Sequence, residues 1–235
     1  MIRIDSLTVQ FGGVRPLDAL DAELAAPICG LIGPNGAGKT TLLNVLSGFI
    51  TPVRGAVHLD GVPLRGLKPT RRVALGLRRT FQQELVVDEL SADENVRAVA
   101  DHLSADRRVA QTEVERALAF VGLADRAAVP GRRLNLFERR MIEIAKTLIG
   151  QPKAILLDEP GAGLDEAETD RLRRLLLEIP GRFGAQLVLI DHDADLIAAL
   201  CVETLVLDFG KRLAFGPTRA VLDDPVVRRA YLGTA

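Results

Sequence analysis

Apolar residues recur at nearly alternate positions at the start of the chain, which is the period of a half-buried strand. These residues are Ile2, Ile4, Leu7, Val9 and Phe11. The pattern predicts a first β-strand with one side facing a core.

A compact apolar run at residues 27–32 comes next and ends in a glycine-rich loop. It predicts a buried strand, and the apolar spacing over residues 42–46 predicts a helix that stops at Gly48. Residues 55–64 predict a strand pair that turns at Asp60-Gly61.

The second half of the chain continues with helical and strand patterns. From about 91 to 148 the pattern is helical, with a break around 129–131. The later elements are strands at 154–157 and 187–190, a charged helix at 166–178 between them, a terminal hairpin of 205–207 and 213–215, and a short helix that ends near Tyr231. Strands alternating with helices predict an α/β fold with a mostly parallel sheet, here interrupted by a helical insertion.

Composition narrows the function classes. The chain has 235 residues, enough for one large domain or a core with lobes. Its formal net charge of -1 argues against a general nucleic-acid binder, which normally carries a strongly basic face.

Cys29 and Cys201 have no metal-ligand spacing and predict reduced thiols. No apolar stretch approaches the roughly 20 residues that span a bilayer, and the start shows no signal peptide. Any membrane role is therefore expected to come through a partner.

The glycine-rich loop reads Gly-Pro-Asn-Gly-Ala-Gly-Lys-Thr and fits the pattern G-x-x-x-x-G-K-[ST] between a strand and a helix. Its backbone N–H groups can surround phosphate oxygens, and the helix N-terminus adds positive potential. Lys39 is expected to reach the β- and γ-phosphates, Thr40 to ligate Mg²⁺ and Thr41 to bond the α-phosphate. The alternative, a glycine turn that matches by chance, fits this context poorly. The expected nucleotide-binding residues of the loop are Gly33, Pro34, Asn35, Gly36, Ala37, Gly38, Lys39, Thr40 and Thr41.

An apolar strand ends in two adjacent carboxylates, Asp158 and Glu159. Two such charges repel strongly unless a cation lies nearby, so the pair is typical of a metal site. Asp158 is expected to hold Mg²⁺ through its water shell, and Glu159 to polarise the attacking water. The alternative is an acidic pair that caps a helix before Pro160.

The next predicted strand ends in Asp191-His192-Asp193. Ligands of open α/β sheets bind where the core strands end. We therefore expect His192 to contact the γ-phosphate and to orient the water. A purely structural hydrogen-bonding role is the alternative.

Together these motifs resemble those of the ATP-binding-cassette (ABC) ATPases over essentially the whole chain, which implies ATP and Mg²⁺ as cofactors. The resemblance implies that Phe11 stacks on adenine, with a plain core Phe as the alternative. It also implies that Gln82, in Arg-Thr-Phe-Gln, touches Mg²⁺ and senses a membrane subunit. The loop ending at Asp165 is implied to cross a dimer interface, and His192 matches the switch histidine of the family.

The fold that the resemblance implies is one ABC ATPase domain over 1–235. It consists of a P-loop NTPase (RecA-like) core, an N-terminal antiparallel β subdomain and an inserted helical subdomain. The expected bounds are about 27–50 and 148–235 for the core, about 1–26 and 51–67 for the β subdomain, and about 83–147 for the helical subdomain.

Within that family, several details look most like the ATPases of branched-chain amino acid importers. They are Phe11-Gly-Gly, Arg79–Gln82 with the following Glu94-Asn95, Asp191-His-Asp and the closing Ala230-Tyr-Leu-Gly233. Relatives with similar cassettes carry urea, other amides, aromatic acids or lipids. The resemblance implies a second ATPase subunit, two membrane permease subunits and, indirectly, a solute-binding protein, with no nucleic acid. It places the chain in the cytoplasm, on the inner face of the cell membrane.

The family signature, Leu-Ser-Gly-Gly-Gln, is altered in this chain. Its place is taken by Leu134, Asn135, Leu136, Phe137 and Glu138. Asn135 is a polar substitute and the helix dipole remains, but Leu136 and Phe137 are expected to add side chains where the backbone must come close. Either the loop works with altered geometry, or this cassette pairs with a different one and only one of two ATP sites is fully active. Our hypothesis is the second.

Residues 85–87 are apolar and are expected either to dock a membrane subunit or to lie partly in the core. Two rival functions remain. A soluble cassette acting on nucleic acid or ribosomes usually has a long coiled-coil insertion or a second cassette, and this chain has neither. A non-catalytic regulatory cassette fits the altered signature, but the expected catalytic side chains are all present.

Overall fold

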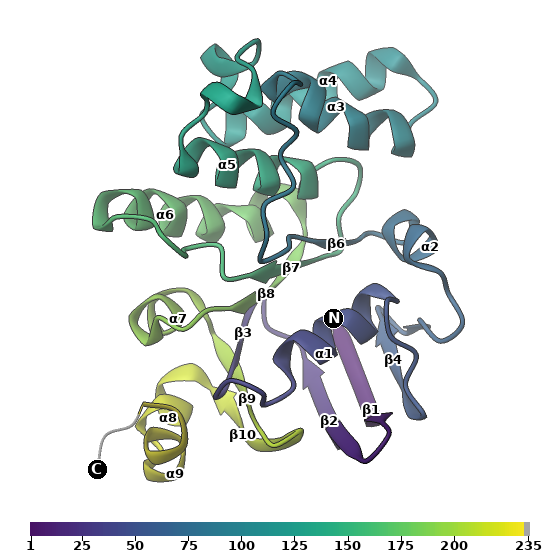
Figure 1. Ribbon diagram of the computed structural model, residues 1–235, viewed down its shortest axis with the longest axis vertical. Coiled ribbons are helices and arrows are strands. Elements are labelled where there is room, and N and C mark those ends of the chain that lie inside the picture. Colours follow the sequence, from purple (N-terminus) through teal and green to yellow (C-terminus); the bar gives the residue numbers. More distant parts are fainter. Residues whose placement is uncertain (233–235) are drawn as a thin grey trace.

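The structure is a computed structural model that describes residues 1–232. Its strands form two sheets (Figure 1). The first is antiparallel with the order β2-β1-β4-β5, and its strands are β1 (Ile2–Phe11), β2 (Val14–Leu24), β4 (Arg54–Leu59) and β5 (Val62–Pro63). Gly233, the last residue of the closing motif, lies outside the described residues.

The second sheet has the order β10-β9-β3-β8-β7-β6. Its strands are β3 (Ile28–Ile32), β6 (Leu77–Arg79), β7 (Ala154–Asp158), β8 (Gln186–Ile190), β9 (Glu203–Asp208) and β10 (Lys211–Pro217). The neighbours from β9 to β6 are parallel, and β10 returns antiparallel to β9.

Three helices gather at one end of the molecule, with α6 between them and the larger sheet (Figure 1). They are α3 (Ala92–Leu103), α4 (Arg107–Phe120) and α5 (Leu136–Thr147), joined by the short helices Ala124–Arg126 and Gly131–Arg133. The other helices are α1 (Lys39–Ser47), α2 (Pro69–Ala74), α6 (Glu166–Phe183), α7 (Ala194–Leu200), α8 (Thr218–Asp223), α9 (Pro225–Val227) and a π-helical turn at Arg228–Leu232.

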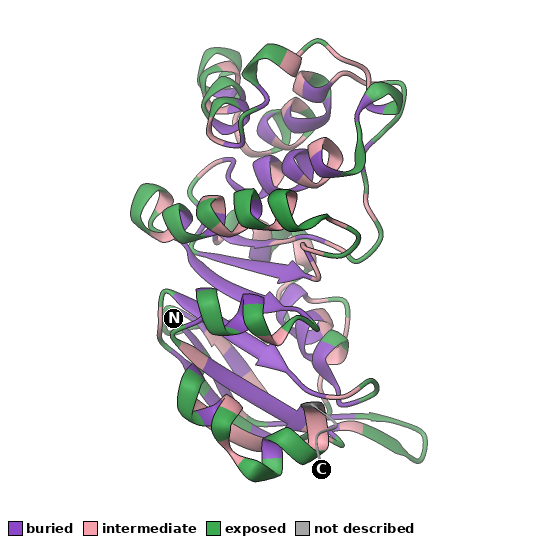
Figure 2. Cartoon of the chain, turned by 90° about the vertical axis from the view of Figure 1, so that its left-hand side faces the viewer, coloured by how far each residue is buried: buried purple, intermediate pink, exposed green. Residues whose placement is uncertain are grey.

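The parallel strands of the larger sheet are buried on both sides, whereas the edge strand β10 is not (Figure 2). In β3, Ile28 and Ile32 belong to the core shared with the helical end, whereas Cys29 and Leu31 belong to the core shared with α1 and the antiparallel sheet. Successive residues of a strand point to opposite faces. A strand covered on both faces therefore appears in sequence as the unbroken apolar run at 27–32.

Most of the predicted elements are present, and the predicted end of the first helix and the predicted turn at Asp60-Gly61 are confirmed. Gly48 ends α1 in the left-handed region (φ 86°), and Asp60 and Gly61 both have positive φ in the turn between β4 and β5. The predicted charged helix runs further, to Phe183, and the expected terminal helix is a series of short pieces. The sequence analysis missed β2, β6, α2 and α7.

No helix within residues 1–232 combines the length and the apolar character that crossing a bilayer requires.

A buried arginine fastens α2 to the end of α1. The guanidinium of Arg72, which is 5% exposed, donates to the carbonyls of Val45 and Leu46 in the last turn of α1. It also donates to the carbonyls of Leu64 (2.8 Å) and Leu67 (3.0 Å). Carbonyls at a helix C-terminus lack intrahelical partners, so the cation supplies both donors and a favourable charge.

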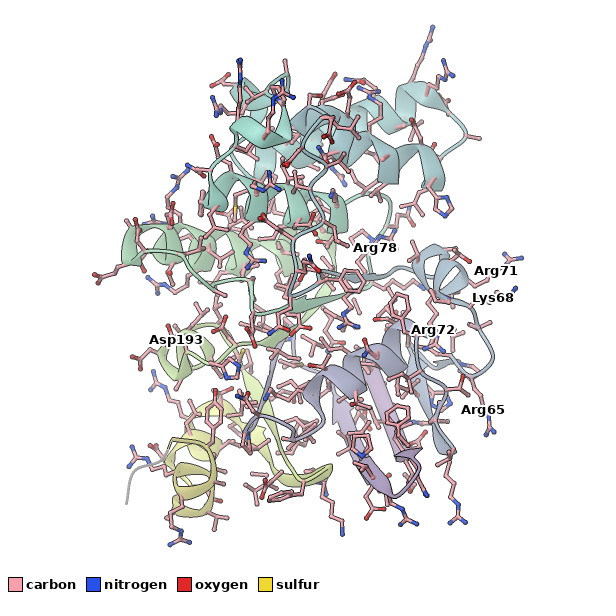
Figure 3. All side chains as sticks on the ribbon, viewed as in Figure 1. Arg65, Lys68, Arg71, Arg72, Arg78 and Asp193 are labelled. Atoms are coloured by element: carbon pink, nitrogen blue, oxygen red, sulfur yellow. The ribbon has the colours of Figure 1, made fainter. Side chains whose placement is uncertain are left out.

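We predict that Arg72→Met lowers the free energy of unfolding by about 2–4 kcal/mol, because buried carbonyls lose their donors. The matched control is Arg71→Met, one residue earlier on α2, whose exposed side chain points away from the protein (Figure 3). It should change the free energy by less than about 0.5 kcal/mol. Urea unfolding followed by circular dichroism measures both, and equal losses in the two variants would contradict this account of Arg72.

Candidate functional site

The parallel strands bring the predicted motifs to one edge of the larger sheet. The phosphate-loop pattern follows β3, the acidic pair closes β7, and Asp191-His192 follows β8. Their side chains surround a cavity of about 290 Å³. The lining residues are Pro16, Asn35, Gly36, Ala37, Gly38, Lys39, Thr40, Thr41, Gln82, Asp158, Glu159, Ile190 and His192.

The loop after β3 approaches the backbone of two other strands too closely for side chains. Gly33 has φ 146°, and a Cβ there would lie 2.1 Å from the carbonyl oxygen of Leu207 on β9. Gly38 has φ 107°, and a Cβ there would lie 2.2 Å from the carbonyl oxygen of Pro16 on β2. Only glycine fits both positions, and the loop amides can then face the cavity.

Lys39 begins α1 and is 8% exposed. Its Nζ donates to the carbonyls of Gly33 (2.6 Å) and Pro34 (3.0 Å), which holds the side chain along the loop. Burial lowers the pKa of Lys39, and the carboxylates of Glu159 and Asp158 oppose that shift. The cavity thus has a fixed cation at the loop and carboxylates opposite, which suits a phosphate chain bound with a metal ion.

Asp158 ends β7 and is 4% exposed. Its Oδ2 accepts a hydrogen bond from Nη2 of Arg79 at 3.2 Å, and its backbone N–H donates to Oγ1 of Thr80 at 3.2 Å. Burial raises the pKa of Asp158, and the charge of Arg79 opposes that rise. Thr40, Gln82 and Asp158 line the same cavity and offer oxygen ligands, the kind that Mg²⁺ prefers.

The three residues that were predicted to be catalytic meet, with Gln82 and His192 both contacting the carboxylate of Glu159. Oε1 of Glu159 lies 2.8 Å from Nε2 of His192, and Oε2 accepts a hydrogen bond from Nε2 of Gln82 at 3.2 Å. The backbone of Glu159 is in the left-handed region (φ 50°), and its N–H donates to the carbonyl of Ile190 at 2.8 Å. Such strained conformations of non-glycine residues concentrate at functional sites.

The loop that carries His192 is fixed from the far end of the chain. Oη of Tyr231 lies 3.1 Å from the carbonyl oxygen of Asp191 and 3.2 Å from that of His192. Burial raises the pKa of Tyr231 to about 12, so its hydroxyl remains a donor. The Asp191 carboxylate accepts the N–H of Asp193 at 3.0 Å. The sequence analysis gave Tyr231 no role, because the only signal was its place in the closing motif.

Phe11 is not a core residue. It ends β1 and is 54% exposed, so the core alternative is wrong. It is not among the residues that line the cavity, whereas Pro16, which the sequence analysis did not single out, is. Contact between Phe11 and adenine therefore stays a prediction.

The altered signature loop begins α5 with a complete capping box. Oδ1 of Asn135 accepts the N–H of Glu138 at 2.8 Å, and the Glu138 carboxylate accepts the N–H of Asn135 at 3.0 Å. Glu138 also pairs with Arg126 at 2.8 Å. Asp165 caps α6 in the same way, with Glu168 as its partner. Both loops thus end in rigid helix starts.

One expectation about the signature loop is wrong. Phe137 does not add a side chain to the exposed face of the loop, because it is 5% exposed, belongs to the core and lies under the guanidinium of Arg171 at 4.6 Å. Leu136 is 39% exposed. One of its methyl groups would lie 3.1 Å from a Cβ placed on Gly163, so Leu136 packs beside the loop that leads to Asp165. Of the two, only Leu136 adds a side chain to the exposed side of the loop.

A second cavity, of about 480 Å³, opens between α3, α5 and the segment after β6. We call it the docking groove. It is lined by Val73, Arg78, Arg79, Phe81, Leu85, Val87, Leu90, Asn95, Ala98, Val99, His102, Glu143, Lys146 and Thr147. Leu85 and Val87 are exposed in it, whereas Val86 is buried in the core. Core burial is therefore confirmed for Val86 alone, and docking of Leu85 and Val87 to a membrane subunit stays a prediction.

A family model described as "ABC transporter" matches residues 24–162. The high-affinity branched-chain amino acid transport ATP-binding protein BraF of Pseudomonas aeruginosa is 33% identical over 252 aligned positions, which cover 100% of this chain and 98% of BraF. The lipopolysaccharide export system ATP-binding protein LptB of Acidithiobacillus ferridurans is 35% identical, over 88% of this chain and 85% of LptB.

Among solved structures, the ADP conformation of an ATP-binding cassette of an ABC transporter superposes with a TM-score of 0.88. It is 24% identical and covers 100% of this chain and 99% of that one. This likeness confirms the predicted fold, a P-loop NTPase core with an antiparallel sheet and a helical insertion. With the family match and the full-length relatives, it follows that the chain belongs to the ABC transporter family, as an ATP-binding and ATP-hydrolysing cassette.

Proposed function

We propose that this cassette hydrolyses ATP to drive an importer of branched-chain amino acids or a related small solute, from the cytoplasmic face of the cell membrane. The names of relatives that align along the full chain support the solute class. LptB, at similar identity, is named for export of another cargo, so we assign the choice of solute to partner subunits. The observation that carries the proposed hydrolysis is the convergence of Gln82 and His192 on the Glu159 carboxylate beside the phosphate loop.

Nucleotide binding is assigned to residues 33–41, with the loop amides around the phosphates and Lys39 at the β- and γ-phosphates. The close packing of Gly33 and Gly38 supports this, because it leaves the amides free of side chains. Phe11, exposed at the end of β1, is assigned to adenine. An aromatic face that is already exposed can stack on a base without rearranging a core.

Magnesium, when bound with ATP, would neutralise charge on the phosphates and polarise them for attack. The residues that fit it are Thr40, Asp158 and Gln82, which line the cavity and offer a hydroxyl, a carboxylate and an amide oxygen.

Glu159 is assigned the task of orienting and polarising the attacking water. The contacts from Gln82 and His192 fix the direction of its carboxylate. The hydrogen bond from its backbone N–H to the carbonyl of Ile190 fixes its main chain. His192, 50% exposed, can turn toward a γ-phosphate and return to Glu159 after cleavage. The proton of the water passes to Glu159 or leaves with the phosphate.

Two cassettes are proposed to close on each nucleotide, with Asp165 at their interface. The first turn of α5 in this chain holds its own carboxylate, Glu138, in a capping box. An anion already bound at a helix start reduces its attraction for a second one. We therefore infer a heterodimer whose competent site combines Lys39, Glu159 and His192 of this chain with an intact signature loop on the partner.

Two membrane permease subunits, and through them a solute-binding protein, complete the proposed complex. The docking groove is the surface assigned to a permease segment, since Leu85 and Val87 expose apolar side chains in it. Closure of the two cassettes would then pull on that segment.

We predict that Glu159→Gln keeps ATP binding but lowers turnover by about 10²–10⁴-fold, because the amide cannot take up the proton. Calorimetry measures binding, and phosphate release from the assembled complex measures turnover. Glu178→Gln, an isosteric change at an exposed position of α6, is the matched control and should leave both unchanged. Near-normal turnover in Glu159→Gln would remove Glu159 from this role.

We expect affinity purification from native membranes to recover a second ATPase and two multi-span subunits with this chain. Mixed with the second ATPase, the chain should hydrolyse ATP faster than it does alone, because the partner supplies the intact signature that this chain lacks. If the chain alone is as active as the mixed pair, the heterodimer hypothesis is wrong.

Restoring the signature glycines should affect stability very unequally. Phe137→Gly should lower the free energy of unfolding by about 3–5 kcal/mol, because it empties a core position. Leu136→Gly should lower it by about 1 kcal/mol, the cost of glycine in a helix. Urea unfolding compares the two, and an equally mild effect of Phe137→Gly would show that the ring contributes little to the core.

A further inference from the structure

Arg79 forms part of the wall between the nucleotide cavity and the docking groove. It ends β6, and its Nη2 donates to Oδ2 of Asp158 at 3.2 Å. Its Nη1 donates to Oδ1 of Asn44 on α1 at 2.7 Å, and its guanidinium lies 4.9 Å from the ring centroid of Phe81. Asp158 lines the nucleotide cavity, and Arg79 and Phe81 line the groove.

The ion pair is shielded from water, since the side chains of Arg79 and Asp158 are 7% and 5% exposed. Attraction between charges is stronger where water is excluded, and loss of one partner leaves an uncompensated buried charge. The two side chains are therefore expected to move together. Phe81 extends the contact to the segment that follows α1, because its ring meets that of Phe49 edge to face at 5.9 Å.

The neighbouring arginine is bonded quite differently. Arg78, labelled in Figure 3, is 6% exposed and donates to main-chain carbonyls, those of Val73, Leu77 and Ile149. Its hydrogen bonds tie β6 to α2 and to the segment after α5, and none of them is to Asp158. Arg78 is thus a matched control for Arg79 in residue type and burial.

We propose that Arg79 is a positioning residue that couples the docking groove to the carboxylate assigned to magnesium. A partner side chain that displaces Phe81, or that offers its own carboxylate to Arg79, changes how Arg79 holds Asp158 toward the nucleotide. The inference rests on the proposed function of the cavity. Coupling between two sites is reciprocal, so binding of metal and nucleotide at Asp158 must also shift Arg79 and Phe81 in the groove.

This reciprocity can be tested on the chain without its partners. The sequence contains no tryptophan, so Phe81→Trp places a single fluorescent reporter against Arg79. Its emission is recorded with a non-hydrolysable ATP analogue, once with Mg²⁺ and once with EDTA. We expect a spectral shift with Mg²⁺ and loss of most of that shift with EDTA, because the route to the groove runs through Asp158.

The decisive variants are made in the Phe81→Trp background. Arg79→Met should abolish the Mg²⁺-specific shift. Arg79→Lys should lose most of it, because an ammonium group cannot donate to Asp158 and Asn44 in the fixed planar geometry of the guanidinium. Arg78→Met should keep the shift. If Arg79→Met does not fold, as judged by circular dichroism, Arg79→Lys decides.

Calorimetric measurement of nucleotide binding distinguishes a failure of the proposed function from a failure of the coupling role of Arg79. Absence of nucleotide binding in the folded parent would overturn the proposed function itself. Normal binding with a silent tryptophan, or an undiminished shift in Arg79→Lys and Arg79→Met, would overturn the coupling role of Arg79 alone. A shift lost equally in Arg78→Met would assign the effect to general destabilisation of β6 and would also overturn it.

Discussion

The close packing of the phosphate loop between two other strands is the constraint on which the rest of the site depends. The loop passes the carbonyls of Leu207 on β9 and Pro16 on β2 at distances that leave no room for a Cβ at Gly33 or Gly38. These contacts fix the antiparallel sheet against the parallel one, because β2 and β9 belong to different sheets. They also fix the start of α1 and with it the position of Lys39. A change at either glycine would therefore disturb the arrangement of the sheets as well as the loop.

Around this loop the charges are arranged so that few are buried without a partner. Lys39 faces the carboxylates of Asp158 and Glu159, and Arg79 pairs with Asp158 from the other side. Burial raises the pKa of Asp158, and the charge of Arg79 at the end of β6 opposes that rise. Arg72 and Arg78 donate to main-chain carbonyls and not to acidic side chains. They therefore stabilise the segments around them without further carboxylates being placed near the site. The result is a cavity whose charge favours a phosphate chain with its metal.

The sequence was sufficient to predict the site wherever one local pattern contained the information. The strand–loop–helix at 27–48 and the acidic end of β7 are such patterns, and their residues line one cavity. β2 was missed because Ala19 has φ 49° and shifts the register, so buried Leu17 and Leu20 are three positions apart and do not alternate. β6 was missed because two of its three residues are arginines, and only the fold shows that Arg78 is buried. The bounds of the subdomains and the chemical roles of the site residues remain predictions.

The altered signature loop shows why a pattern can be identified correctly and still be misread in space. Two glycines replaced by Leu136 and Phe137 suggested two obstacles on the surface, but a helix start turns successive side chains to different faces. Phe137 faces the core and Arg171, and Leu136 faces the loop at Gly163. The departure from the family signature is therefore built into the packing of α5 against α6, and is more than a surface change. A helix start held in this way by its core keeps its altered surface. Two identical chains would then present the same altered loop to both nucleotides, which is the physical basis for proposing an unlike partner.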